Sequence, residues 1–128
     1  MTSAAKNSFF DLLISNQSDS FFIDHLQISK SGNKASYELV EFTHPKVPLK
    51  LIKPLQLEVI YETDFKRYVI ENKLFKIFSF NENFQKAAED FELNFYSLWE
   101  EYVLEDESVL TSGAVQLKLL LLEYAAEL

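Results

Sequence analysis

The sequence offers few side chains for acid–base chemistry. It has two histidines, the residue type that most often serves as a base near neutral pH, and these, His25 and His44, lie 19 residues apart. His25 falls in an apolar stretch that is typical of a strand, where neighbouring side chains point to opposite faces, so Asp24 cannot share its face. His44 precedes Pro45 and is predicted to be an exposed turn residue. We therefore expect no catalytic histidine.

Metal and covalent chemistry have little support as well. The chain has no cysteine, which excludes thiolate zinc sites, thiol catalysis and disulfides. The acidic run 105–107 could offer oxygens to Mg²⁺ or Ca²⁺, but it lacks the alternating acids and the glycine of a calcium loop. No nucleophile elbow, phosphate loop or dinucleotide fingerprint occurs. We expect no enzyme activity, no metal and no cofactor.

The composition predicts one folded domain. With 128 residues, of which 48% are hydrophobic, the chain can bury a core without disulfides or metals. We expect a single domain over 1–128, with an N-terminal helix and hairpin in 1–56 and a sheet–helix core in 57–128. No signal peptide or membrane span is predicted, so a cytoplasmic location is the expectation.

The net charge of −8 is concentrated in the second part of the chain. Residues 1–56 contain six lysines and five acids, whereas residues 57–128 contain six basic and fifteen acidic residues, a net charge of −9. Such a segment repels phosphate backbones, so autonomous nucleic-acid binding is not expected. The charge favours a basic protein partner, or it serves solubility alone.

The chain before residue 57 predicts a short helix at 8–14 and a hairpin. The two strands of this hairpin, at 21–28 and 35–42, flank the sequence SGNK, whose Gly and Asn tolerate positive φ. Pro45 and Pro48 then predict an exposed, unpaired crossing. We expect these two strands to belong to an antiparallel sheet.

Three further strands and two helices follow. Apolar residues alternate from Leu55 to Tyr61, and short strands are predicted at 67–72 and 74–80, which completes a meander of about five strands. Asn83 is a predicted N-cap of a long helix, because apolar residues then recur at helical spacing: Phe84, Ala88, Phe91, Phe95, Leu98 and Tyr102. Glu89, Asp90, Glu92, Glu100 and Glu101 are predicted to face solvent.

A leucine-rich helix, capped by Thr111 or Ser112, is predicted from about 113 to 127. This helix is apolar nearly all round, so it needs cover on two sides, from the fold or from a partner. The expected fold class is therefore α+β, an antiparallel sheet packed against one long helix and a C-terminal leucine-rich helix.

The segment from about 57 to 128 resembles the core of HicB-like antitoxins, a partial RNase H-like sheet followed by a helix. The residues that match the strand end, the cap and the helix face of that core are Phe78, Phe80, Asn83, Phe84, Ala87, Ala88 and Phe91. Asn81 stands where the family has Gly, and Asn83 where it has Thr. ENKLFK replaces the family's Pro-Gly segment, and no DNA-binding motif follows. The resemblance implies a binding protein that neutralises a toxin.

We therefore expect a non-catalytic module, an antitoxin or inhibitor that binds a basic, ribonuclease-type protein. The expected anchors are Trp99, Tyr102, Leu120 and Tyr124, and the expected acidic rim is Glu100, Glu101, Glu105 and Asp106. Each of these residues could instead belong to the core or to a homodimer, and a homo-oligomer is expected. The alternatives are a ligand-binding or enzymatic domain with an aromatic pocket, and a homo-oligomeric scaffold.

Overall fold

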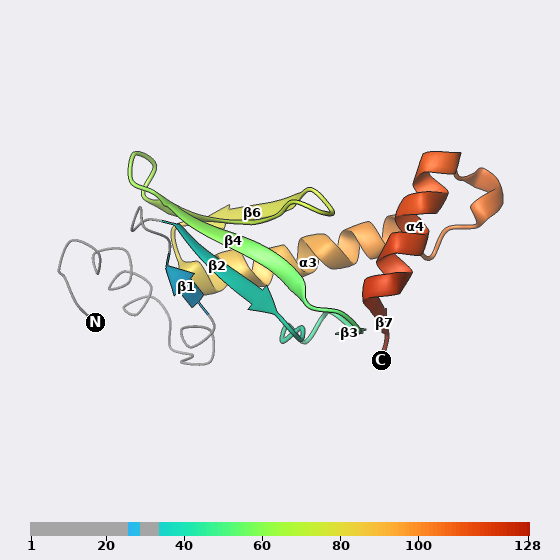
Figure 1. Cartoon of the computed structure of the whole chain (residues 1–128), viewed down its shortest axis with the longest axis horizontal. Helices are drawn as coiled ribbons and strands as arrows, with labels where there is room; N and C mark the ends of the chain where they lie inside the picture. The colour runs from blue at the N-terminus through green and yellow to red at the C-terminus, as the bar shows by residue number, and fades with distance from the viewer. Residues whose placement is uncertain (1–25, 29–33) are drawn as a thin grey trace. The chain divides into compact units, whose positions relative to one another are not determined.

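The computed structural model describes residues 26–28 and 34–128 (Figure 1). The predicted helix at 8–14, His25 and most of the first predicted strand lie outside the described residues. Within the described residues, the fold class is confirmed as α+β, with an antiparallel sheet and two α-helices. The elements in chain order are β1 (Leu26–Ile28), β2 (Lys34–Leu39), β3 (Leu49–Leu51), β4 (Leu55–Glu62), β5 (Arg67–Asn72), β6 (Ile77–Asn81), α3 (Phe84–Tyr102), η1 (Glu107–Val109), α4 (Ser112–Tyr124) and β7 (Ala125–Glu127).

The chain divides into two compact units that each combine an early and a late segment. Residues 1–38 and 56–91 form the first, which we call the sheet unit, and residues 39–55 and 92–128 form the C-terminal unit. Helix α3 contributes residues to both. The predicted boundary lay between residues 56 and 57. The structure instead groups the segment 39–55 with the end of the chain.

The sheet has the strand order β1-β2-β4-β5-β6, so strands that follow each other in this sheet are also neighbours in it. The β4–β5 and β5–β6 pairs are antiparallel, as the predicted meander requires. The predicted alternation of β4 is confirmed, since Leu55, Leu57 and Val59 are buried, while Tyr61 is half-buried. Among the described residues of the sheet unit, the buried apolar ones are Ala35, Tyr37, Leu57, Val59, Tyr68, Ile70, Phe75, Ile77, Phe84, Ala87, Ala88 and Phe91.

The β5–β6 turn is longer than predicted, because β6 begins at Ile77 and not at residue 74. Asn72 holds this turn from the buried end of β5. Its Oδ1 accepts the N–H of Phe75 at 2.8 Å, and its Nδ2 donates to the Gln56 carbonyl at 3.0 Å. Lys76 closes the turn with φ 57°, a left-handed conformation that lets the chain reverse. These local bonds take residues 73–76 out of the ladder.

The start of α3 is confirmed where the sequence predicts it. Asn83 is the N-cap, and its Oδ1 accepts the N–H of Lys86 at 2.9 Å. Ala87 is fully buried, and its carbonyl accepts the hydroxyl of Ser79 at 2.7 Å. A small side chain at this position lets the helix backbone come within hydrogen-bond distance of β6, so the two alanines of the helix serve packing.

The C-terminal unit contains two strands that the sequence analysis missed. β3 pairs with β7 in an antiparallel ladder that joins Leu49 to Glu127 and Leu51 to Ala125. The predicted exposed crossing is therefore wrong in part, because Val47 is buried and β3 starts directly after Pro48. The buried apolar residues of this unit are Leu39, Val47, Leu49, Leu55, Phe95, Trp99, Leu121 and Ala125.

Helix α4 is capped as predicted but ends earlier. The Oγ1 of Thr111 accepts the N–H of Ala114 at 3.2 Å. The helix stops at Tyr124 and not near 127, because Ala125 is extended and enters β7. The Tyr124 carbonyl then accepts the N–H of Ile52 at 2.7 Å, which fastens the helix end to the chain after β3.

The contacts of Asn72 generate a stability prediction. We expect Asn72→Ala to lower the free energy of unfolding by about 2–3 kcal/mol, because one buried and one part-buried backbone group lose their partner. Asn83→Ala, which removes the helix cap alone, should cost about 1 kcal/mol. Urea titrations followed by circular dichroism measure both. Equal losses, or a loss below about 0.5 kcal/mol for Asn72→Ala, would contradict this role.

Candidate partner-binding surface

The eight residues predicted to bind a partner all belong to the C-terminal unit. The four predicted rim acids, Glu100, Glu101, Glu105 and Asp106, are exposed. Of the four predicted anchors, Tyr102, Leu120 and Tyr124 are half-buried. The structure thus brings the acids to the surface at the end of α3 and in the loop that follows it.

Trp99 requires a correction. Its side chain is 2% exposed, so it packs in the core of the C-terminal unit and cannot present a ring to a partner in this structure. Its spacing explains this position, because Trp99 lies four residues after Phe95, which is fully buried. A residue that continues the buried stripe of a helix at this spacing belongs to the same face. We therefore remove Trp99 from the surface anchors.

Sequence reasoning missed the apolar residues that α4 does expose. Leu119 is 56% exposed and Leu122 is 41% exposed, and their spacing of three places them on one face of the helix. Leu121 is the one buried residue of α4. Helix α4 was expected to be covered on two sides. Within the described residues, only the side that carries Leu121 is covered. In the same unit, Leu104 and Val109 of the α3–α4 loop are also exposed.

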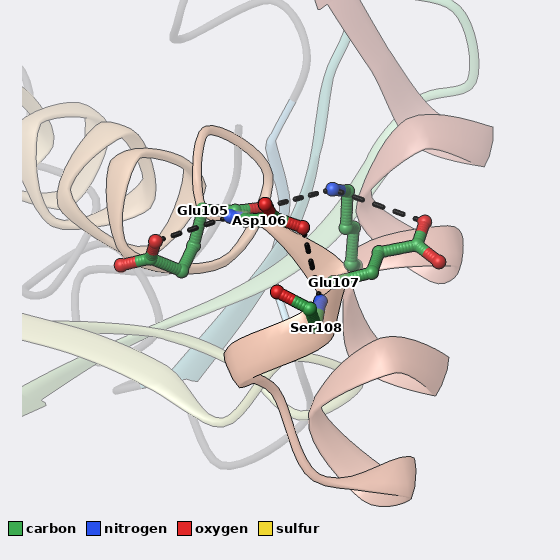
Figure 2. A network of polar contacts seen from close by, with 5 residues as sticks. Glu105, Asp106, Glu107 and Ser108 are labelled. Carbon is green, nitrogen blue, oxygen red and sulfur yellow. Dashed lines mark hydrogen bonds and ion pairs between the residues drawn. The ribbon is translucent and has the colours of Figure 1, made fainter.

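The acidic loop between the helices is held by local hydrogen bonds (Figure 2). Asp106 accepts the N–H of Ser108 at 3.0 Å and caps η1. This hydrogen bond lowers the pKa of Asp106, which keeps the carboxylate charged. Lys118 donates to the Glu105 carbonyl at 3.0 Å and lies 3.9 Å from a Glu107 oxygen. The loop therefore presents its acids on an ordered backbone.

The acidic side chains of this loop do not converge on a common point in the part of the chain that the structure describes. Within 26–28 and 34–128, no three His, Asp or Glu side chains converge in a way that could hold an ion. The side chain of Asp106 is instead directed to the backbone of the loop, as Figure 2 shows. The acids are arranged as separate surface charges.

Glu92 requires a second correction, because it was predicted to face solvent and is 2% exposed. One carboxylate oxygen accepts the backbone N–H groups of Thr43 and His44 at 2.9 and 2.8 Å. The other lies 3.3 Å from the Thr43 hydroxyl, which donates to it. Burial raises the pKa of Glu92, while these hydrogen bonds and the nearby His44 act in the opposite direction. The carboxylate thus holds the chain before β3.

His44 was predicted to be exposed, but it is half-buried. Its ring Nδ1 accepts the N–H of Lys46 at 3.0 Å, and its own backbone N–H goes to Glu92. Both groups therefore serve the turn that leads into β3. This arrangement gives His44 a structural role that the sequence alone did not indicate.

The alternative of an aromatic ligand pocket can be compared with a pocket that the structure describes. A surface pocket of about 440 Å³ lies in the sheet unit, where it is lined by Phe65, Arg67, Phe80, Asn81 and Glu82. The guanidinium of Arg67, one of these lining residues, lies 4.3 Å from the Phe80 ring centroid and 4.8 Å from that of Phe65. Its Nε donates to Glu62 at 2.6 Å. No histidine lines this pocket.

Comparisons of the chain with protein-family models, with curated proteins and with solved structures find no match. The resemblance to HicB-like antitoxins therefore stays a prediction. Of the helices that the structure describes, none combines the length and the apolar character needed to cross a bilayer. The feature that bears on function is therefore the exposed surface of the C-terminal unit.

The buried carboxylate generates a pH prediction. Because the pKa of Glu92 is raised in the folded state, its contribution to stability is complete below the ordinary value of 4.5 and is lost as pH rises through the folded pKa. The free energy of unfolding, relative to that of Glu92→Gln, should therefore fall as pH increases from 4.5. The slope can reach about 1.4 kcal/mol per pH unit.

Denaturant titrations of both proteins between pH 4.5 and 8 measure this difference. Glu100→Gln, an exposed substitution on the same helix, controls for the loss of one negative charge. A difference between the wild type and Glu92→Gln that stays constant, or that grows in favour of the wild type as pH rises, would contradict the account.

Proposed function

We propose that this protein is a non-catalytic binding module of the cytoplasm, an acidic antitoxin or inhibitor that neutralises a basic, ribonuclease-type protein. The observation that carries the proposal is the pairing of exposed leucines on α4 with exposed acids at the end of α3 and in the following loop. Apolar anchors within a charged rim are the usual composition of a protein-binding surface.

The apolar centre of the proposed surface is formed by Leu119 and Leu122. Both leucines expose a large fraction of their side chains on a helix that buries a single residue, Leu121. Half-buried Leu120 and Tyr124 of the same helix would extend the contact. Covering these side chains stabilises a complex by about 25 cal/mol for each Å² of apolar surface removed from water.

The acidic rim supports a basic partner. Glu100, Glu101, Glu105 and Asp106 are exposed. The cations nearby are already engaged, since Lys118 contacts Glu105 and Glu107 and Lys53 forms an ion pair with Glu123. A field of this sign accelerates association with a basic protein and repels nucleic acid. The charge therefore favours a partner that itself binds RNA, because such a protein carries a basic surface.

The proposal of a non-catalytic role draws on the roles of the polar groups in the C-terminal unit. Glu92 and His44, the carboxylate and the imidazole that come near each other, are engaged with backbone N–H groups. The family resemblance over 57–128 adds the expectation of toxin neutralisation. Together these points favour inhibition by binding over a reaction at this site.

The test begins with capture of the partner from a native lysate and its purification with the wild-type chain. We expect Leu119→Lys together with Leu122→Lys to weaken that complex at least about 100-fold, because two charges would be buried at the centre of the interface. Surface plasmon resonance measures the affinity. Leu74→Lys, at an exposed leucine of the sheet unit, is the matched control and should bind as the wild type does.

The same measurement separates charge from apolar contact. Glu100→Lys with Glu101→Lys should slow association severalfold and change dissociation little, because exposed rim charges act mainly on encounter. A partner that is acidic, or one that binds the α4 double variant as tightly as the wild type, would refute the proposed surface.

A further inference from the structure

The pocket of the sheet unit is lined by two opposite charges that do not pair with each other. Arg67 and Glu82 both belong to its lining. Among the described residues, Arg67 pairs with Glu62, whereas Glu82 forms no ion pair. The Arg67 guanidinium and the Glu82 carboxylate therefore lie beyond salt-bridge distance of each other, and a ligand that fills the pocket can contact both.

The guanidinium of Arg67 is held in place by its neighbours. The ring centroids of Phe65 and Phe80 lie 4.8 and 4.3 Å from its Cζ, and its Nε donates to Glu62 at 2.6 Å. The guanidinium makes no other hydrogen bond to a described residue, so its two Nη groups keep their donors available. A guanidinium fixed in this way loses little conformational entropy when its Nη groups bind an oxyanion.

Asn81 adds a second donor to the lining of the pocket. Its Oδ1 accepts the N–H of Asn83 at 2.9 Å, and this hydrogen bond fixes the orientation of the amide. The Nδ2 of Asn81 donates to none of the described residues. A carboxylate accepts hydrogen bonds at both of its oxygens, so Arg67 and Asn81 together offer the donors that one carboxylate requires.

The charges of the pocket discriminate among classes of ligand. Glu62 compensates part of the Arg67 charge and Glu82 adds a second carboxylate, so a purely anionic ligand is repelled. A purely cationic ligand is repelled by the guanidinium. A neutral ligand would remove water from both charges and give neither an ionic partner. A ligand that carries one charge of each sign satisfies both Arg67 and Glu82.

We propose that this pocket binds a free α-amino acid with an apolar side chain. The α-carboxylate accepts from Arg67 and Asn81, and the α-ammonium pairs with Glu82. The apolar side chain covers the rings of Phe65 and Phe80, which are 65% and 49% exposed. The volume of about 440 Å³ lies in the range of small-molecule sites. This site belongs to the sheet unit, so it does not depend on the proposed partner surface of the C-terminal unit.

The affinity should be modest, because the ligand is small and the two rings of the pocket stay partly open to water. For phenylalanine we expect a dissociation constant of about 1 mM. An NMR titration of the amide resonances with up to about 20 mM phenylalanine covers this range. The largest shifts should fall in 65–67 and 80–82, the segments that line the pocket. Unchanged resonances in these segments over the whole titration overturn the proposal.

Two analogues of phenylalanine test the need for both charges. Hydrocinnamate has the same skeleton without the ammonium, and phenethylamine has it without the carboxylate. Each should bind at least about tenfold more weakly than phenylalanine, because one charged group of the pocket then loses its partner. Glycine, which keeps both charges but lacks the apolar side chain, should also bind at least about tenfold more weakly. Equal affinity for phenylalanine and for any of these three ligands overturns the proposed ligand class.

Substitutions assign each ligand charge to a residue. Glu82→Gln should weaken phenylalanine at least about tenfold without weakening hydrocinnamate, which has no ammonium to lose a partner. Arg67→Gln should weaken phenylalanine in the same way without weakening phenethylamine. Glu71→Gln, on β5 but outside the pocket lining, is the matched control and should bind phenylalanine as the wild type does.

Glu82 is exposed and forms no ion pair, so its substitution tests the site even if Arg67→Gln does not fold. Unchanged phenylalanine binding in Glu82→Gln overturns the proposal. Equal weakening of phenylalanine and hydrocinnamate by this variant also overturns it, because the ammonium would then have no part in the effect.

Discussion

The buried carboxylate of Glu92 is the interaction on which the C-terminal unit depends. It satisfies two backbone N–H groups at Thr43 and His44 and so fixes the chain that leads to β3. The β3–β7 ladder in turn sets the point where α4 must end, because β7 begins at Ala125. A carboxylate that is 2% exposed tolerates burial only with such partners. The position of Glu92 on α3 therefore requires that the segment before β3 pack against it.

The exposed surface of α4 follows from this arrangement. With its C-terminus held by the Tyr124–Ile52 hydrogen bond, the helix turns Leu121 inward and leaves Leu119 and Leu122 outside. The acids at the end of α3 are exposed as well, and in the proposed complex they would favour a partner of positive charge.

Most of the fold could be predicted from local signals. The helix caps at Asn83 and Thr111 form hydrogen bonds to backbone N–H groups three residues later, and asparagine and threonine are residue types that predict such caps. The strands β3 and β7 could not be predicted in this way. Each has three residues, too few to show a periodic pattern, and each depends on a partner far along the chain. The burial of Glu92 could have been predicted from its spacing, because it lies four residues after Ala88 and three before Phe95, within the buried stripe. Its charge favoured the opposite prediction, a position in solvent.

The central claim, that a partner covers α4, is tested most directly by hydrogen–deuterium exchange with mass spectrometry. The chain alone is compared with the chain in its purified complex. The account predicts slower exchange in peptides from 100–107 and 112–124, while peptides from β6 show the same exchange as in the free chain at equal concentration. Unchanged exchange in α4, with slowing confined to the sheet unit, would contradict it.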